Sequence, residues 1–286
     1  MKNPFKLLLV LILLAACNST VQENSDSAFD TPYGSDDKVG KYITLNGAKL
    51  YYEEYGKGEP LLLIHGNSGS IQSMEKQIDY FKNKYRVIIA DNRGQGKSEL
   101  KTDSLTFNQI TADWEALVNY LKLDSVNIVG WSDGGIIAIK MEISGKTNIK
   151  KLVAMGANLR PDSTAVHAWA INHDKETLKE IKAKIKENDT TQNWDLQKQL
   201  VEMLLTQPNI PNTDLAKIRA QVLIMAGDED ITKNSHSVEM YESIPNAQLC
   251  IMPGETHYTP VSNPPFFNEI VGRFLSEPFK RPYSYF

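Results

Sequence analysis

A serine between glycines is the first candidate for chemistry in this chain. The segment Gly130-Trp131-Ser132-Asp133-Gly134 follows the apolar run 126–129 and precedes an amphipathic stretch. A strand that turns sharply into a helix exposes the hydroxyl of its corner residue, and flanking glycines remove Cβ atoms that would clash. At the start of a helix, Ser132 would also lie beside unpaired N–H groups that favour a developing anion. The pattern predicts that Ser132 is a nucleophile.

A serine hydroxyl becomes a good nucleophile only beside a base, for which histidine is the usual choice. Of the five histidines, His257 lies in a Gly-containing loop after the last apolar run, where we expect the edge of a sheet. His236 precedes that run, which favours a role in capping or packing a helix. His167 and His173 belong to a helical region, where they could touch a substrate or lie at the surface. We therefore predict that His257 is the base.

The base in turn needs an acid that holds its tautomer and stabilises its protonated form. Three acidic residues, Asp228, Glu229 and Asp230, follow the apolar run 221–225 in a single loop. Residue type and position alone do not choose among them. The sequence therefore offers a serine, an acid and a histidine in that order along the chain.

Short β-branched runs that alternate with amphipathic stretches must position these residues. Such alternation predicts an α/β fold with a mostly parallel eight-stranded sheet and helices on both faces. The predicted strands are 42–45, 49–55, 61–64, 86–90, 126–129, 151–153, 221–225 and 248–252. The predicted helices between them are 71–81, 107–121, 134–143, 237–243 and 265–275. The first two strands meet around Asn46-Gly47, which favours an antiparallel hairpin.

One region interrupts this alternation. Residues 158–215 contain no convincing strand, but they carry helical patterns at 175–185 and 194–205 with prolines between them. We predict a helical cap, inserted between two parts of one core at 39–157 and 216–276. An insertion at this point usually lies over the site, and the alternative is a set of surface helices with no role in binding. The tail 277–286 is rich in aromatic residues and has no predicted role.

The first residues have the composition of a processing signal. Lys2 and Lys6 precede the apolar run 7–16, which is too short to span a bilayer, and small residues precede Cys17. Leu14-Ala15-Ala16-Cys17 resembles the lipobox of bacterial lipoproteins, which makes residues 1–17 a signal with its lipobox and implies cleavage before Cys17, so that Cys17 becomes the mature N-terminus with a lipid on its thiol. A plain secretory signal is the alternative. Both predict export, and the lipid predicts anchoring on the cell membrane or the outer membrane, outside the cytoplasm.

The segment after this signal differs from the rest of the chain. Residues 18–38 are rich in Ser, Asn, Asp and Gly and lack apolar periodicity, so we expect a flexible tether. The chain has two cysteines, and with Cys17 lipidated Cys250 would have no disulfide partner.

Composition and motif spacing argue against several other functions. The formal net charge of −4 does not suggest a polyanionic partner such as nucleic acid, and no pair of histidines has the spacing of metal ligands. The segment 91–98 ends in Gly-Lys-Ser, but a phosphate-binding loop needs a glycine where Asp91 stands. We expect a small-molecule ester substrate and, through the lipid anchor, a membrane as partners; we expect no metal, no cofactor and no nucleic acid, and the sequence implies no protein partner.

The motifs together resemble the α/β-hydrolase superfamily. HGNSGS, DNRGQGKS, GWSDGG, GDED and GETHY occur in order across residues 41–276. The resemblance implies Asp230 as the acid, because it stands three places after a glycine, with Asp228 as the alternative. It also implies that the backbone N–H groups of Asn67 and Asp133 form the oxyanion hole, and that His65 has a structural role.

A narrower resemblance concerns the substrate. GWSDGGIIAI and MGAN are similar to biphenyl-hydrolase-like proteins, including the valacyclovirase type that cleaves amino-acid esters. This implies that the Asp133 carboxylate receives a substrate ammonium; the alternative is that Asp133 contributes only its N–H and a charge at the helix start. Trp131 is the other residue expected to bind substrate. Asn67 also resembles the halide-binding amide of haloalkane dehalogenases, but those enzymes use an aspartate nucleophile, which Ser132 argues against.

The sequence therefore predicts a serine hydrolase that cleaves a carboxylic ester through an acyl-enzyme, with Ser132, His257 and Asp230 as its catalytic residues. A C–C bond hydrolase, an enol-lactonase or a perhydrolase would use the same three residues. A ligand receptor on the same scaffold, without turnover, is the alternative outside enzymes.

Overall fold

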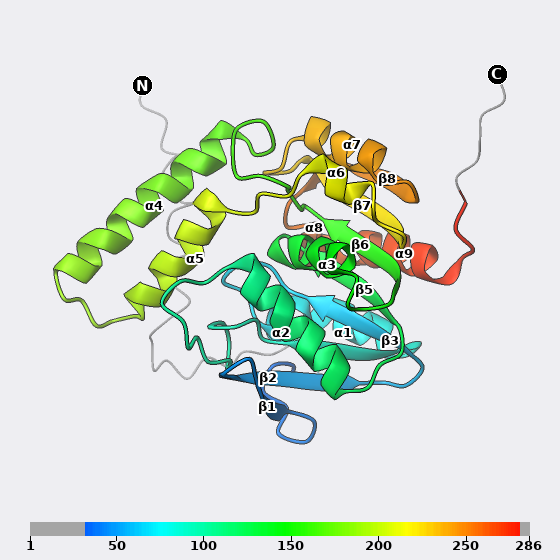
Figure 1. Ribbon diagram of the computed structural model, residues 1–286, viewed down its shortest axis with the longest axis horizontal. Helices are drawn as coiled ribbons and strands as arrows, with labels where there is room; N and C mark the ends of the chain where they lie inside the picture. The colour runs from blue at the N-terminus through cyan, green and yellow to red at the C-terminus, as the bar shows by residue number, and fades with distance from the viewer. Residues whose placement is uncertain (1–31, 281–286) are drawn as a thin grey trace.

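A single eight-stranded sheet forms the centre of the molecule, and a pair of helices projects from one side of it (Figure 1). The computed structural model describes residues 32–280. The strand order is β1-β2-β4-β3-β5-β6-β7-β8. The pairs β1–β2 and β2–β4 are antiparallel, and the other five pairs are parallel. The predicted α/β architecture, with its N-terminal hairpin and mostly parallel sheet, is confirmed.

All eight predicted strands are present. They are β1 (Lys41–Leu45), β2 (Ala48–Tyr55), β3 (Glu59–Ile64), β4 (Tyr85–Ala90), β5 (Val126–Trp131), β6 (Ile149–Met155), β7 (Gln221–Glu229) and β8 (Ala247–Thr256). The last two extend four residues beyond the predicted ends, because Glu229 pairs with Thr256 past the apolar runs. These extensions, Ala-Gly-Asp-Glu on β7 and Pro-Gly-Glu-Thr on β8, lead into the loops that follow the two strands.

The helices differ from the predicted ones mainly at their ends. They are η2 (Ile71–Met74), α1 (Glu75–Phe81), α2 (Phe107–Tyr120), α3 (Asp133–Ser144), α4 (Ala168–Lys186), α5 (Trp194–Thr206), α6 (Asn212–Leu215), α7 (Asn234–Ser243), α8 (Thr259–Ser262) and α9 (Pro264–Ser276). The predicted helix 71–81 is divided into a 3₁₀ turn and an α-helix, and the two short helices α6 and α8 had no sequence signal.

Continuous apolar strands explain why helices cover both faces of the sheet. On β3, Leu61 and Leu63 belong to a core with α1 and α9, whereas Leu62 and Ile64 belong to a core with α2 and α3. All four side chains are fully buried. A strand that is apolar on both faces needs cover on both faces, which the crossover helices of a parallel sheet provide.

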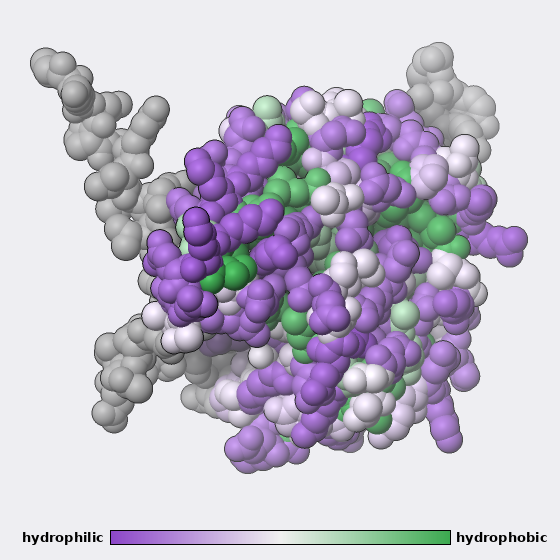
Figure 2. All heavy atoms as spheres, turned by 60° about the vertical axis from the view of Figure 1, so that its left-hand side comes forward, coloured by the Kyte–Doolittle hydropathy of each residue, from purple (hydrophilic) through white to green (hydrophobic). Residues whose placement is uncertain are grey.

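Residues 158–215 hold α4, α5 and α6 and contribute no strand to the sheet. Helices α4 and α5 pack on each other and project from the core beside α2 (Figure 1). Figure 2 shows that this side of the molecule is mostly hydrophilic, with hydrophobic atoms in separate groups. Within residues 32–280, every helix is too short or too polar to cross a bilayer.

The described part of the expected tether packs on the core. Tyr33 is buried, and the N–H groups of Gly34 and Asp36 donate to the buried carboxylate of Glu53. The predicted tether 18–38 therefore extends too far toward the core at its C-terminal end, because the buried carboxylate of Glu53 on β2 binds the backbone of residues 33–36. The signal, Cys17 and residues 18–31 lie outside the described residues.

Candidate active site

The turn from β5 into α3 places Ser132 in a strained backbone conformation. Ser132 has φ of 57° and ψ of −121°, outside the regions that most residues adopt. A Cβ at Gly130 would lie 2.2 Å from the Gly134 carbonyl oxygen, and one at Gly134 would lie 1.9 Å from that of Ile64. Both glycines are therefore required for the tight strand-to-helix turn that presents the serine hydroxyl.

His257 joins Ser132 to a carboxylate. Its Nε2 lies 2.9 Å from the Ser132 Oγ, and its Nδ1 lies 2.7 Å from an oxygen of Asp230. The carboxylate fixes the tautomer, because Nδ1 must carry a proton to donate to it, which leaves Nε2 able to accept the serine proton. The structure brings together three side chains that lie on three different loops at the carboxyl ends of β5, β7 and β8.

The acid loop, residues 227–232, distinguishes Asp230 from its neighbours. Asp230 is 2% exposed and also accepts hydrogen bonds from the N–H groups of Gly227 and Thr232. Asp228 is exposed and instead accepts the N–H of Glu255. Of the three acidic residues that the sequence left open, Asp230 alone contacts the imidazole among the described hydrogen bonds.

Gly156 and Trp131 also constrain the position of His257. A Cβ at Gly156, at the end of β6, would lie 2.6 Å from the His257 Nδ1. The indole N–H of Trp131 donates to the His257 carbonyl oxygen at 2.8 Å. The contact observed for Trp131 is thus with the backbone of the histidine loop, and its role in binding substrate stays a prediction.

The loop after β3 lies directly against the serine. A Cβ at Gly66 would lie 3.0 Å from the Ser132 Cβ, so only glycine allows this approach. Among the described residues, the backbone N–H groups of Asn67 and Asp133 have no hydrogen-bond acceptor. Two unpaired donors beside a serine hydroxyl are suited to stabilise an oxyanion.

His65 supports this loop. It is fully buried, its Nε2 accepts the Asn92 N–H, and its Nδ1 donates to the Gly66 carbonyl oxygen. Burial lowers the pKa of His65 to about 4, with the Gly66 hydrogen bond partly opposing the shift. A neutral imidazole that bonds the backbone at both nitrogens has the structural role that the sequence favours.

The Asp133 side chain forms a second buried polar pair beside the serine, with the side chain of Asn67. Its carboxylate is 2% exposed and accepts the Asn67 side-chain amide at 3.0 Å. Burial raises the pKa of Asp133 to about 6, Asn67 and His257 oppose this shift, and Asp174 on α4 adds to it. The structure thus pairs two predicted site residues through their side chains, whereas the sequence assigned Asn67 only a backbone donor.

The remaining candidates have structural contacts. His236 is buried and bonds the Leu159 N–H and the Glu239 carboxylate, in agreement with a packing role. Asp91 accepts the N–H groups of Ile71 and Lys97, which makes the DNRGQGKS segment a closed turn. Residues 32–280 contain no group of three His, Cys, Asp or Glu side chains that could hold a metal ion.

Two residues near the site were not identified from the sequence. Gly156 is the glycine of the MGAN segment, and its positive φ of 63°, which marks it as a required glycine, is visible only in the structure. Asp174 is one of many charged residues on an amphipathic helix, and nothing in its local sequence separates it from the solvent-exposed ones.

Known proteins resemble this chain in sequence and in fold. A family model described as alpha/beta hydrolase fold matches residues 59–201, half of the chain. The chain is 32% identical over 120 residues to (E)-2-((N-methylformamido)methylene)succinate hydrolase of Acinetobacter baylyi, a match that covers 41% of this chain and only 45% of that protein. It is 26% identical over 256 residues to serine hydrolase BPHL of Mus musculus, covering 82% of this chain and 85% of that protein. The solved structure of a bromoperoxidase from Bacillus anthracis is similar with a TM-score of 0.71 at 26% identity, covering 83% of this chain and 100% of that one.

Proposed function

The chain belongs to the α/β-hydrolase family, and on that basis we propose that it is a serine hydrolase that cleaves a carboxylic ester. The observation that carries this proposal is the continuous hydrogen-bonded path from Ser132 through His257 to Asp230. Such a path activates a hydroxyl that is otherwise a weak nucleophile.

In the first half-reaction, the Ser132 Oγ attacks the ester carbonyl carbon while His257 Nε2 takes the hydroxyl proton. The carbonyl oxygen gains a negative charge, which the N–H groups of Asn67 and Asp133 stabilise. Collapse of this intermediate breaks the bond to the alcohol oxygen, and His257 returns the proton to that leaving group. The products are the free alcohol and an acyl group on Ser132.

The second half-reaction uses the same groups with water. His257 takes a proton from a water molecule, the resulting hydroxide attacks the acyl carbon, and Ser132 leaves with the proton that His257 returns. Asp230 stays ionised throughout and stabilises the imidazolium form of His257 in each step. One ester and one water give one alcohol and one acid, so no redox partner is needed.

We propose further that the acyl group carries a positive charge. The Asp133 carboxylate follows Ser132 in the chain and is buried, and Asn67 is its one hydrogen-bond donor among the residues that the structure describes. Asp174 lies close enough to raise the Asp133 pKa by repulsion. A substrate ammonium would relieve both the desolvation and the repulsion, so the site favours a cation on the carbon next to the ester carbonyl.

Hydrolysis of matched esters tests this function. We expect wild-type protein to turn over p-nitrophenyl esters, and Ser132→Ala to lose at least about 10³-fold of kcat/KM. A panel with C–C cleavage and enol-lactone substrates tests the alternatives that use the same residues. Turnover of either of these in place of simple esters would replace the proposed reaction, and slow labelling by a fluorophosphonate with no turnover would favour a receptor.

We also propose export and lipid anchoring through Cys17, supported by the small residues that precede this cysteine. Wild-type cells grown with an alkyne fatty acid should incorporate it into the protein, and Cys17→Ser should not. The same incorporation in both variants would contradict the proposal.

A further inference from the structure

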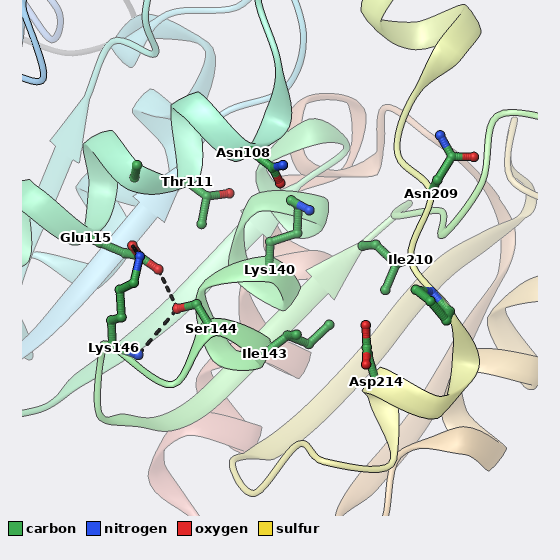
Figure 3. Close-up of a pocket in the computed structure, with 12 residues that line it drawn as sticks. Asn108, Thr111, Glu115, Lys140, Ile143, Ser144, Lys146, Asn209, Ile210 and Asp214 are labelled. Carbon is green, nitrogen blue, oxygen red and sulfur yellow. Dashed lines mark hydrogen bonds and ion pairs between the residues drawn. The ribbon is translucent and has the colours of Figure 1, made fainter.

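A second cleft lies on the side of the core, away from the serine. It has a volume of about 290 Å³ and opens between α2, α3 and residues 209–214, which lead from the cap toward β7 (Figure 3). Lys140 on its wall lies two turns beyond Ser132, roughly 12 Å along α3 at 1.5 Å per residue. The cleft is therefore distinct from the catalytic residues, although one helix connects the two.

Two polar groups that line the cleft, one hydroxyl and one ammonium, have no hydrogen-bond or ion-pair partner among the described residues. Thr111 is 5% exposed, and its hydroxyl oxygen has no hydrogen-bond partner within residues 32–280. The ammonium of Lys140 has neither a hydrogen bond nor an ion pair with any residue that the structure describes. Figure 3 shows both side chains, from facing helices, directed toward the same space. A buried hydroxyl without a partner is costly, whereas Lys140 is only half-buried, so a ligand that contacts both would gain mainly by serving the hydroxyl.

Neither acidic residue of the cleft forms an ion pair with Lys140 among the described residues. Glu115 accepts the Ser144 hydroxyl and pairs with Lys146 at 3.2 Å. Asp214 pairs with Lys217 at 2.6 Å. Burial lowers the pKa of Lys140, with Asp214 opposing the shift. Lys140 is therefore the lysine of the cleft that has no ion pair among the described residues, although Asp214 lies near enough to act on it, and a ligand carboxylate could supply such a pair.

Part of the cleft wall is apolar. Ile143 from α3 points toward Ile210 from the segment that leaves the cap (Figure 3), and Pro211 and Ala112 also line the cleft. Ile210 is 7% exposed, so this wall is part of the packed core. A ligand for this cleft therefore has an apolar body as well as an anionic group.

We propose that this cleft binds a small organic monocarboxylate, whose carboxylate is held by the Lys140 ammonium and the Thr111 hydroxyl while its apolar body packs on Ile143 and Ile210. The carboxylate would supply an acceptor for the hydroxyl and a counter-charge for the ammonium. This site is separate from the proposed ester hydrolysis and does not depend on it.

Calorimetric titration with benzoate tests the site, using full-length protein in which a fluorophosphonate blocks Ser132. Where the serine does not react, Ser132→Ala serves in its place. Benzoate should bind with a Kd on the order of 1 mM, as expected for so small a ligand. Benzamide has the same shape without the charge and should bind at least about tenfold more weakly. Equal binding of the two compounds, or no saturable binding of benzoate, would overturn the proposal.

Two variants locate the binding. Lys140→Met should weaken benzoate binding about tenfold or more, because the charge-assisted hydrogen bond is lost, whereas Lys150→Met, on the exposed surface, should leave it unchanged. Thr111→Val should also weaken binding, yet raise the melting temperature of the unliganded protein, because a methyl group replaces a buried unpaired hydroxyl. A Lys140→Met protein that binds benzoate as tightly as wild type would contradict the site.

Discussion

Ser132 lies between two regions that each bury a carboxylate. In the acid loop, Asp230 accepts three hydrogen bonds, from His257 and from the N–H groups of Gly227 and Thr232. On the other side, Asp133 accepts one, from Asn67, and burial raises its pKa to about 6. A buried carboxylate is stable as an anion only when donors replace the lost water.

The difference suggests a division of labour between the two regions. The acid loop has its donors in place before substrate arrives, so its negative charge is ready to orient His257. In the Asn67–Asp133 pair, the carboxylate can accept further hydrogen bonds, which a cationic group of the substrate would donate. On this view, one region supplies the reaction and the other supplies the selection of substrate, and each can be altered alone.

The largest effect is expected in the acid loop. Asp230→Asn should lower kcat for p-nitrophenyl esters by about 10³ to 10⁴-fold, because an amide favours the wrong tautomer of His257. Asp228→Asn is the matched control, two residues away and exposed, and should change kcat by no more than about twofold. Steady-state kinetics of the two variants measures this, and a larger loss in Asp228→Asn would reassign the acid.

The next largest effect tests whether the position of the imidazole matters as much as its partner. In Gly156→Ala the new Cβ would meet the His257 Nδ1, and we expect a loss of about 10²-fold in kcat. Gly145→Ala is the control, because Gly145 has a similar φ of 66° but no atom within 4 Å of such a Cβ. Both variants should lose about 1 kcal/mol of stability to backbone strain. Equal kcat in the two would show that Gly156 does not position the histidine.

A smaller effect is expected from the substrate-selecting side. Alanine and isobutyrate p-nitrophenyl esters have the same shape and differ by the ammonium group. Asp133→Asn keeps the backbone N–H and should lower the ratio of kcat/KM between the two esters about tenfold, while leaving the isobutyrate ester largely unaffected. An unchanged ratio would show that the Asp133 carboxylate does not bind the ammonium, and that Asp133 contributes only its backbone N–H and a charge at the start of α3.

The smallest effect is a pH dependence of that same ratio. A carboxyl group with a pKa of about 6 loses its charge as the pH falls through that value. Preference for the alanine ester in wild-type protein should therefore fall about fivefold to tenfold from about pH 7 to about pH 5. Groups that act on both esters cancel in the ratio, and Asp133→Asn should show a flat profile. A flat profile in wild type would contradict an ionised Asp133 as the binding group.

Much of the site could be predicted because its signals are local. The β5 strand, the glycines around Ser132 and the start of α3 all lie within twenty residues, and backbone sterics dictate the turn. The pairing of Asn67 with Asp133 could not be predicted, because it joins side chains 66 residues apart whose contact depends on how two loops meet. The packing of residues 33–36 was missed for the same reason, since the polar composition of that segment gives no sign of its partner, Glu53.

The ends of the last two strands show a further limit. Apolar runs predicted β7 and β8 correctly up to Met225 and Met252, where side chains are buried. Beyond these residues the strands continue through small residues and proline to a polar end, and the backbone pairing between Glu229 and Thr256 extends them to that end. Where the side chains of a strand are exposed to water, the hydrophobic pattern of the sequence does not show whether the backbone continues to pair.

The central claim is that Ser132 forms a covalent acyl intermediate with its ester substrate. Mass spectrometry of protein quenched by acid during turnover of a p-nitrophenyl ester measures this directly. We predict an added acyl group on the peptide that contains Ser132, and none on that peptide in Ser132→Ala. An acyl group on another residue during rapid turnover, or turnover that persists in Ser132→Ala, would contradict the account.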